Sequence, residues 1–372
     1  MKFLIISHVE HSQDNGKVYG YGPYIKEMNL WLKHVDKVRI VAPIQKRSAD
    51  AIDLAYEHQD IRFDKVPSFN LLTKISKVKT LLRLPLISLR IFIAMLWADH
   101  IHLRCPGNMG LLGAVVQILF PWKIKTVKYA GNWDPDSKQP LSYRLQKKII
   151  SNPFVSKNMK VLVYGQWPNQ STNIVNFFTA TYKDIEKEKI DIRSLDKQMK
   201  IVFVGALSPG KRPIIAVEAI HKLKINGMNV HLDIMGEGPE RNNLEQYIKE
   251  HDLAEEITLH GNQSSTFVKE KFKQSNFLIL MSKSEGWPKV VAEAMFWGSV
   301  PITTNVSCVD YMIGSGSRGS LVEPDSISVS KAIENYSKKE DYYKETASNA
   351  LEWSRQFTLE SFENEIVGVL NA

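Results

Sequence analysis

The sequence has few cysteines and no long apolar run. Its 372 residues include only two cysteines, Cys105 and Cys308, whose separation suits neither a disulfide framework nor a metal cluster. We expect both to be reduced thiols in a cytoplasmic protein, because the apolar stretch at 3–6 is too short for a secretory leader. The longest apolar window, 84–97, is interrupted by Arg90 and is too short to cross a bilayer. Disulfide-stapled and integral membrane proteins are therefore not expected.

Acidic residues are scarce in the first half of the chain. Residues 1–180 contain 25 Lys and Arg and 12 Asp and Glu (+13), whereas residues 181–372 contain 23 and 28 (−5), which together give the net charge of +8. Between Lys65 and Lys128 the single acidic residue is Asp99. This asymmetry predicts that the first half meets an anionic ligand or surface. Nucleic acid is not the expected partner, because no nucleic-acid-binding motif or aromatic-basic repeat occurs.

Strand and helix patterns alternate along the chain. This alternation predicts parallel sheets with helical crossovers, and the length suits two α/β domains. The charged residues 181–199 show no clear period and form the expected linker, between an N-terminal domain at 1–180 and a second doubly wound domain at 200–350. Two helices are expected within 341–370. The expected strands lie at 2–7, 37–42, 100–103, 125–129, 161–164 and 173–178, and then at 201–204, 230–235, 257–259, 277–281 and 300–303.

A turn and a helix start follow the expected strand 277–281. Gly286 permits a tight turn, and Pro288 suits the first turn of a helix, where its missing N–H is not needed. The helix is expected at 290–297, with Gly298 as its stop signal. The N–H groups and the positive dipole end of such a helix favour an anion.

Two glutamates, Glu285 and Glu293, flank this helix start with seven residues between them. The apolar neighbours of Glu293 leave little water around its carboxylate, which would be costly without a partner. A vicinal diol such as a ribose would supply two hydrogen bonds, and Glu285 would face a second polar group. The alternative is that Glu285 caps the helix and Glu293 lies on its surface.

Residues 284–295 and 298–302 together resemble the donor-site signature of family 4 retaining glycosyltransferases, which are GT-B enzymes that use sugar nucleotides. Similar family segments occur at 202–211, 232–239, 257–261 and 319–324. The resemblance covers roughly residues 200–325, and the first half only in outline. It implies an α/β fold of the GT-B class: two Rossmann-like doubly wound domains facing across a cleft, with a C-terminal helix at 351–372 packing back on the N-terminal domain.

The resemblance also implies a donor site. Glu293 would hold the donor ribose, Glu285 would contact the donor sugar, and Lys211 would neutralise the diphosphate; the alternative for Lys211 is a solvated basic loop. The arginine of the family falls at Ala206 here, and Arg212 is the candidate to replace its charge. The other donor-binding candidates are Gly286, Trp287, Lys289, Val290, Gly205, Gly261, Asn262 and Gly22.

Candidates for the acceptor side follow two strands of the first half. Arg104 comes after the strand 100–103, and Asn132, Trp133 and Asp134 come after 125–129, where many relatives carry a histidine that this chain lacks. Asp134 is the third catalytic candidate, beside Glu285 and Lys211, since it can bind hydroxyl groups or take a proton. For Trp133, stacking on a sugar and packing in a core stay equally open.

The expected activity is metal-independent, retaining transfer of a sugar from a UDP- or GDP-sugar, without a further cofactor, to a glycan or lipid-linked glycan. The setting implied is bacterial surface polysaccharide or lipopolysaccharide biosynthesis. Residues 74–97 mix cations with large apolar side chains and are expected as two helical pieces divided at Pro85. They predict peripheral contact with an anionic membrane, at the inner face of the plasma membrane. A GT-B nucleotide-sugar epimerase and a non-catalytic nucleotide-sugar or membrane-binding protein remain alternatives.

Overall fold

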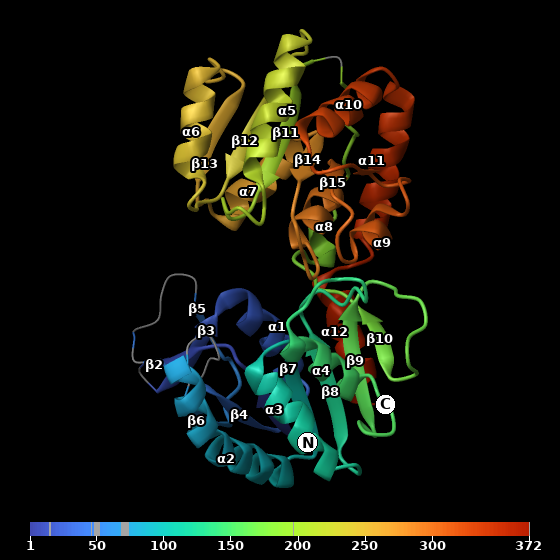
Figure 1. Ribbon diagram of the computed structural model, residues 1–372. Helices are drawn as coiled ribbons and strands as arrows, with labels where there is room; N and C mark the ends of the chain where they lie inside the picture. The colour runs from blue at the N-terminus through green and yellow to red at the C-terminus, as the bar shows by residue number, and fades with distance from the viewer. Residues whose placement is uncertain (15, 46, 48–52, 68–73, 196, 372) are drawn as a thin grey trace. The chain divides into compact units, whose positions relative to one another are not determined.

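The computed structural model describes residues 1–371 except 15, 46, 48–52, 68–73 and 196, and it leaves the side chains of 74–82 undescribed. The chain divides into two units (Figure 1). Unit 1 comprises Met1–Phe178 and Phe362–Ala372, and unit 2 comprises Thr179–Ser361.

Unit 1 is built on a parallel sheet of seven strands in the order β10-β9-β8-β7-β1-β4-β6. Its strands are β1 (Lys2–Ile6), β4 (Lys37–Pro43), β6 (Ile61–Val66), β7 (His100–Cys105), β8 (Ile124–Tyr129), β9 (Met159–Tyr164) and β10 (Ile174–Phe177). Short apolar runs form them; Phe3, Leu4 and Ile5, for example, are fully buried. The chain changes its direction of travel across the sheet between β1 and β7, so ligands are expected at the carboxyl ends of these two strands.

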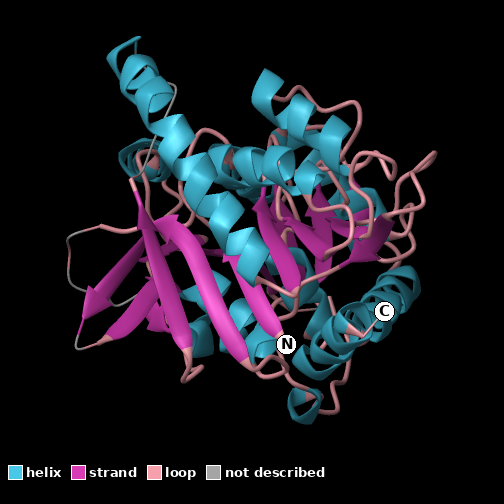
Figure 2. Ribbon diagram, turned by 90° about the horizontal axis from the view of Figure 1, so that it is seen from below, coloured by secondary structure: helices cyan, strands magenta, loops and turns pink. Residues whose placement is uncertain are grey.

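Helices lie on both faces of the strands (Figure 2). In unit 1 they are α1 (Gly22–Leu32), α2 (Lys74–Trp97), α3 (Asn108–Val116), the short 3-10 helix η1 (Gln117–Leu119), α4 (Leu141–Ile150) and, from Phe362 onward, α12 (Leu359–Leu370). Ile91 and Met95 of α2 are fully buried and belong to the same core as Leu4, Ile101 and Val127 of the sheet.

A small antiparallel sheet in unit 1 was not predicted. It consists of β2 (His11–Asp14), β3 (Lys17–Tyr21) and β5 (Asp53–Ala55). These strands are short and partly polar, so they carry no apolar run that would reveal them. Gly22, one of the donor-binding candidates, follows β3 and is the first residue of α1.

The predicted break at Pro85 is wrong. The structure has one helix, α2, with Pro85 in its interior. A proline removes one helical hydrogen bond and either bends or breaks a helix, and here the helix continues through Pro85. No helix in the part of the chain that the structure describes is long and apolar enough to cross a membrane.

Unit 2 contains a parallel sheet in the order β13-β12-β11-β14-β15-β16. Its strands are β11 (Met199–Val204), β12 (Val230–Met235), β13 (Ile257–Gly261), β14 (Phe277–Leu280), β15 (Val300–Thr303) and β16 (Ser320–Leu321). Its helices are η2 (Asp184–Glu186), α5 (Pro213–Ile225), α6 (Arg241–Glu250), α7 (Ser265–Gln274), α8 (Lys289–Phe296), α9 (Val309–Ile313), α10 (Ser326–Ser337) and α11 (Glu340–Ser354). This strand order is that of a dinucleotide-binding fold, with its switch point between β11 and β14. All the strands predicted in both halves lie within two residues of the observed ones.

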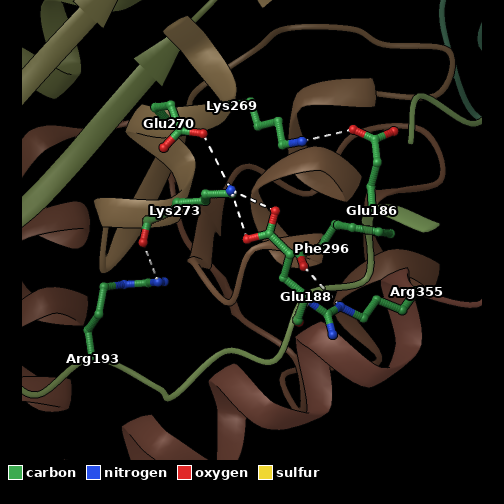
Figure 3. A network of polar contacts seen from close by, with 8 residues as sticks. All are labelled: Glu186, Glu188, Arg193, Lys269, Glu270, Lys273, Phe296 and Arg355. Carbon is green, nitrogen blue, oxygen red and sulfur yellow. Dashed lines mark hydrogen bonds and ion pairs between the residues drawn. The ribbon is translucent and has the colours of Figure 1, made fainter. Parts of the chain in front are cut away.

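The segment 181–199, expected as a linker, lies against unit 2 (Figure 3). Glu188 pairs with Lys273 at 2.9 Å, and the backbone carbonyl of Glu188 accepts a 2.7 Å hydrogen bond from Arg355. Glu186 pairs with Lys269 at 2.9 Å, and Arg193 donates to the Lys273 carbonyl at 2.8 Å. These contacts hold the segment against α7 and against Arg355, which follows α11.

Candidate active site

Lys211 and Glu285 meet at the switch point of unit 2. Lys211 follows β11 and Glu285 follows β14, which are neighbouring parallel strands. The Lys211 ammonium forms an ion pair with a carboxylate oxygen of Glu285, and the two side chains are 29% and 11% exposed. Two of the three residues predicted to act in catalysis therefore share one place at the carboxyl edge of the sheet, where doubly wound folds bind ligands.

Backbone contacts hold the two loops together. The N–H of Lys283 donates to the carbonyl of Gly210 at 2.9 Å, and Arg212 approaches the Met281 carbonyl at 3.4 Å. Arg212 has a left-handed backbone (φ 50°) at the N-cap of α5, a conformation that costs free energy in a residue other than glycine. Arg212 therefore lies beside the end of β14, next to the loop that carries Glu285.

Gly205 follows β11 and Gly236 follows β12, and the two turns that these glycines begin lie against each other. A side chain at Gly205 would meet no atom within 4 Å, whereas one at Gly236 would collide with the Gly205 carbonyl. Both have positive φ values, 152° and 147°. The first turn after β11 and the first turn after β12 therefore pack backbone against backbone, and Gly205 leaves open space on its other side.

Hydrogen bonds and aromatic packing hold the turn that leads from Glu285 into α8. The Gly286 carbonyl accepts hydrogen bonds from the Ser307 hydroxyl at 3.0 Å and from the Cys308 thiol at 3.1 Å. Trp287 is buried, 6% exposed, and its ring stacks 6.2 Å from that of Trp353. The side chain of this donor-site candidate thus packs in the core of unit 2, and only its backbone remains for a ligand.

Helix α8 begins directly after this turn, with Pro288 as N-cap and Lys289 and Val290 as its first two residues. Within the described chain no side chain caps this end. The first N–H groups of a helix have no partner inside the helix and carry a partial positive charge. The helix ends at Phe296, and Gly298 follows with φ 74°, as predicted. The start of α8 is therefore suited to an anion next to Glu285 and Lys211.

Glu293 lies in the second turn of α8 and has a partner within unit 2. Its carboxylate accepts a 2.7 Å hydrogen bond from the hydroxyl of Thr181. The cavity that Glu293 lines, with Tyr182, Lys289 and Phe357 among its walls, holds only about 10 Å³. In this conformation the Thr181 hydroxyl thus occupies one carboxylate oxygen of Glu293, and a ribose bound at that oxygen would have to replace it.

Gly261 and Asn262 lie at the outer strand of the sheet. Gly261 has a left-handed backbone (φ 70°), and its carbonyl accepts from the Gly236 N–H at 2.8 Å. A side chain at Gly261 would lie 2.8 Å from the Glu237 carboxylate, whereas Asn262 is exposed. These two candidates are separated from β14 by β12 and β11, which corresponds to roughly 14 Å at normal strand spacing.

In unit 1, Arg104 is held by other side chains. Its guanidinium lies 3.1 Å from the Glu27 carboxylate and 5.3 Å from the ring centre of Tyr24. Burial by itself would lower the pKa of Arg104, but Glu27, Tyr164 and Tyr24 together outweigh it and raise the pKa. Arg104 is thus a fixed cation on β7, beside the switch point of this unit.

Asn132, Trp133 and Asp134 form a tight turn after β8. The Asn132 amide oxygen accepts from the Asp134 N–H at 2.9 Å, and Asp134 accepts from the Asp136 N–H at 2.9 Å. Trp133 is 5% exposed and lies under the Lys147 ammonium, 5.0 Å from the ring centre. In this conformation Trp133 packs in the core of unit 1, which favours the packing role over stacking on a sugar.

His8, which follows β1, was not among the residues predicted to form a site. His8 lines a cavity of about 230 Å³ at the switch point of unit 1, together with Glu10, Gly107 and Tyr143. Burial lowers the pKa of His8, and the nearby positive charge of Arg104 lowers it further. The feature of the sequence that could have identified His8 is its position shortly after the first predicted strand. No cluster of three or more His, Cys, Asp or Glu suited to a metal ion occurs among the described residues.

Known proteins resemble this chain in part or throughout. Residues 184–353, all within unit 2, match the family described as Glycosyl transferases group 1. An alpha-D-kanosaminyltransferase from Streptomyces kanamyceticus is 26% identical over 38% of this chain and 37% of its own. A Campylobacter jejuni alpha-1,4-N-acetyl-D-galactosaminyltransferase, whose name specifies a diphospho-undecaprenol-linked acceptor, is 27% identical over 46% of this chain and 48% of its own.

The match to these curated relatives thus spans under half of their length. Over the whole chain, the crystal structure of Anabaena HepE with UDP and glucose has a TM-score of 0.68 at 14% identity, covering 100% of this chain and 99% of that one. This likeness shows the fold, which is GT-B. Residues 184–353 of this chain thus resemble the Glycosyl transferases group 1 family.

Proposed function

We propose that this protein is a retaining glycosyltransferase that moves a sugar from a nucleotide-sugar donor to a glycan or lipid-linked glycan acceptor. The observation that carries the proposal is the ion pair between Lys211 and Glu285 beside the start of α8. A cation, a carboxylate and a helix N-terminus are the groups needed to hold a pyrophosphate and a sugar side by side. The names of the Campylobacter relative and of the HepE complex support a lipid-linked glycan and UDP as ligand classes.

Lys211 would act on the leaving group. Negative charge on the pyrophosphate grows as the bond to the sugar breaks, so a fixed cation stabilises the transition state more than the ground state. Arg212 and the N–H groups of Trp287, Lys289 and Val290 would add to this stabilisation. These protein groups would neutralise the diphosphate without a metal ion.

Glu285 would orient the donor sugar by accepting hydrogen bonds from its hydroxyl groups. The oxygen of the acceptor would form a bond to the anomeric carbon while the bond from that carbon to the diphosphate breaks on the same face. The acceptor proton would pass to the departing phosphate oxygen, so the configuration is retained. Asp134 would bind acceptor hydroxyl groups from unit 1.

Helix α2 supports a peripheral membrane setting. Leu86, Leu89, Ile93 and Leu96 lie on one side of the helix and are between 47% and 54% exposed. Arg83 and Arg90 are exposed on the same helix. An apolar stripe with flanking cations suits the surface of an anionic membrane. We therefore propose peripheral contact at the inner face of the plasma membrane, in polysaccharide or lipopolysaccharide assembly. The earlier part of the predicted segment, 74–82, has side chains outside the described structure.

The test is incubation of the purified full chain with UDP- and GDP-sugars, with and without a lipid-linked glycan. Release of nucleotide together with a lengthened glycan, of retained anomeric configuration by NMR, is the expected result. Glu285→Ala should lower turnover more than it weakens nucleotide binding, because it acts on the sugar. An isomerised donor would show an epimerase instead, and a donor left intact in every mixture would show a binding protein.

A further inference from the structure

A cavity of about 660 Å³ in unit 2 lies beside the edge strand β16, α10 and the start of α11 (Figure 1). Asn305, which follows β15, and Tyr342, in the first turn of α11, also line it. Helix α10 contributes positions that recur every three or four residues, and which therefore lie on one side of the helix: Ser328, Lys331, Ala332, Asn335 and Tyr336. The volume is in the range of sites for small ligands.

This cavity is separate from the candidate active site. Lys211 and Glu285 follow β11 and β14, and neither lines the cavity. In the sheet, β15 lies between β14 and β16, so β16 is roughly 10 Å from β14 at normal strand spacing. The lining residues of α10 extend from Ser328 to Tyr336, which is about 12 Å along a helix. The cavity therefore runs along the edge of the sheet.

Leu321 of β16 offers a backbone donor and a backbone acceptor to this cavity. The Val322 N–H donates to the Thr303 carbonyl at 2.9 Å, so the Val322 backbone points toward β15. Successive residues of a strand direct their backbone groups alternately to its two sides, so the N–H and carbonyl of Leu321 point to the free edge. An added peptide strand would need several such residues, but β16 has only two, and Pro324 follows soon after. The edge suits a small ligand better than a peptide.

The polar side chains of the lining match a saccharide. Four of them form no hydrogen bond with any other described side chain or backbone group: Asn305, Glu323, Lys331 and Asn335. One carboxylate and one ammonium leave the lining without net charge, which does not favour a phosphate or a nucleotide. The two amides each offer two donors and an acceptor, and sugar hydroxyl groups both donate and accept. The lining therefore suits a neutral ligand with many hydroxyl groups.

Tyr342 adds an aromatic surface that is already held in place. Its ring stacks on that of Tyr336, with 5.4 Å between the ring centres and 9° between the planes. Tyr336 is buried, and its hydroxyl shares a 3.0 Å hydrogen bond with the Ser320 hydroxyl. Tyr342 is 47% exposed, so the ring face opposite Tyr336 can pack against the C–H groups of a pyranose. Because the ring is held, this packing costs little conformational entropy.

We propose that this cavity binds a saccharide, with hydroxyl groups bonded to Asn305, Asn335 and the Leu321 backbone and one pyranose ring packed on Tyr342. The site is an additional one, distinct from the sites of the donor and of the reacting acceptor group. Its assignment to a remote part of the glycan acceptor or product rests on the proposed transferase function. Binding of a saccharide does not, because no residue of the donor site lines the cavity.

Titration of the full chain with oligosaccharides, followed by saturation-transfer NMR without nucleotide, tests the proposal. The probes are maltotriose, cellotriose and triacetylchitotriose, and at least one of them should bind saturably. Asn335→Ala should lower the affinity about five-fold, the usual effect of losing one hydrogen bond. Tyr342→Ala should lower it by a similar factor, whereas Tyr342→Phe keeps the ring and should keep the affinity.

Asn242→Ala is the matched control, because Asn242 is an exposed asparagine on α6, which does not line the cavity. It should bind the saccharide like the unaltered protein, and so should Glu285→Ala. The proposal is overturned if none of the three probes binds saturably, or if Asn335→Ala and Tyr342→Ala leave the affinity unchanged. A loss in Glu285→Ala equal to that in Asn335→Ala would place the saccharide at the donor site, and an equal loss in Asn242→Ala would show an unspecific effect; either overturns it.

Circular dichroism of each variant ensures that lost binding is not lost folding. The outcome is separable from that of the transfer assay. Saccharide binding that depends on Asn335 in a protein without transfer activity would support the cavity assignment and contradict the proposed function. Transfer activity without such binding would do the reverse.

Discussion

Lys211 and Glu285 neutralise each other at the point in unit 2 where a donor pyrophosphate and its sugar are proposed to bind. Each side chain is therefore already satisfied before any ligand arrives. A donor would have to exchange this ion pair for two others, between Lys211 and phosphate oxygens and between Glu285 and sugar hydroxyl groups. The pair also keeps both side chains in place on their loops, which lowers the ordering cost of binding.

The first prediction concerns this exchange. Glu285→Gln removes the competing carboxylate, so UDP without a sugar should bind more tightly while sugar transfer falls. Lys211→Met should weaken UDP binding by about 1.5–3 kcal/mol, which is the usual contribution of a hydrogen bond to a charged group. Calorimetry with UDP measures both changes.

Lys283→Met serves as the control for Lys211→Met. Lys283 lies on the loop after β14, and its side chain is exposed. Its contact with the other loop runs through its backbone N–H and survives the substitution. If Lys283→Met weakened UDP binding as much as Lys211→Met, the effect would come from net charge and not from the ion pair.

Most strands of the two parallel sheets, though not β6 and β16, and the meeting of Lys211 with Glu285 were predictable from the sequence. Apolar runs bounded by turn residues mark the strands, and residues after adjacent parallel strands must lie at one edge. The direct pairing of the two side chains was not predictable. Both were expected to face a ligand, and the choice between ligand and mutual contact depends on loop geometry.

Other features depend on contacts that are remote in sequence. Thr181 and Glu293 are 112 residues apart, so no local pattern indicates their hydrogen bond. The burial of Trp133 depends on Lys147 and Gln170, which reach it from α4 and from the loop after β9. A single sequence indicates which residues are apolar or charged, but not which of several partners each one finds.

The second prediction concerns Thr181. Thr181→Val removes the hydrogen bond to the Glu293 carboxylate and should lower the free energy of unfolding by about 1 kcal/mol, the usual net contribution of one hydrogen bond. If a donor ribose takes the place of Thr181 beside Glu293, the same substitution should tighten nucleotide binding. Urea unfolding measures the expected loss of stability, and calorimetry measures the expected gain in nucleotide affinity.

Thr266→Val is the control for this substitution, because Thr266 is exposed near the start of α7. It should change neither quantity. Weaker nucleotide binding in Thr181→Val would mean that Thr181 positions Glu293 for the ribose instead of competing with it. Glu293→Gln should weaken nucleotide binding in either case, and an unchanged affinity in that variant would remove Glu293 from the donor site.

The third prediction is that both cysteines are unreactive in the folded protein. Cys105 and Cys308 are free and buried. Burial raises the pKa of Cys308 to about 12 and raises that of Cys105 as well, so almost no thiolate is present at neutral pH. Iodoacetamide at pH 7.5 should leave the native protein unmodified by intact mass spectrometry and should add two groups in urea. Modification of Cys308 in the native state would show that the turn at Gly286 opens.

The fourth prediction uses Lys147, which donates to the Trp133 carbonyl at 2.9 Å. Burial lowers the pKa of Lys147 from 10.5 to about 8, although the charge of Asp134 acts in the opposite direction. Between pH 8 and 10.5 the unfolded chain therefore holds more protons at this residue than the folded chain does. Stability from this group rises with pH across that window and is lower at neutral pH, where the folded protein must carry a buried ammonium.

Lys147→Met removes this dependence. The free energy of unfolding of the variant relative to the unaltered protein should fall as the pH rises from 8 to 10.5, by an amount on the order of 1–3 kcal/mol. Urea unfolding of both proteins at several pH values measures the difference between their free energies of unfolding. Other groups that titrate in this range contribute equally to both proteins, so their contribution cancels. Lys148→Met, at an exposed neighbour on the same helix, should give a flat difference. A flat difference for Lys147→Met as well would mean that the ammonium is hydrated in solution, and that the turn at 132–134 is more open than its hydrogen bonds indicate.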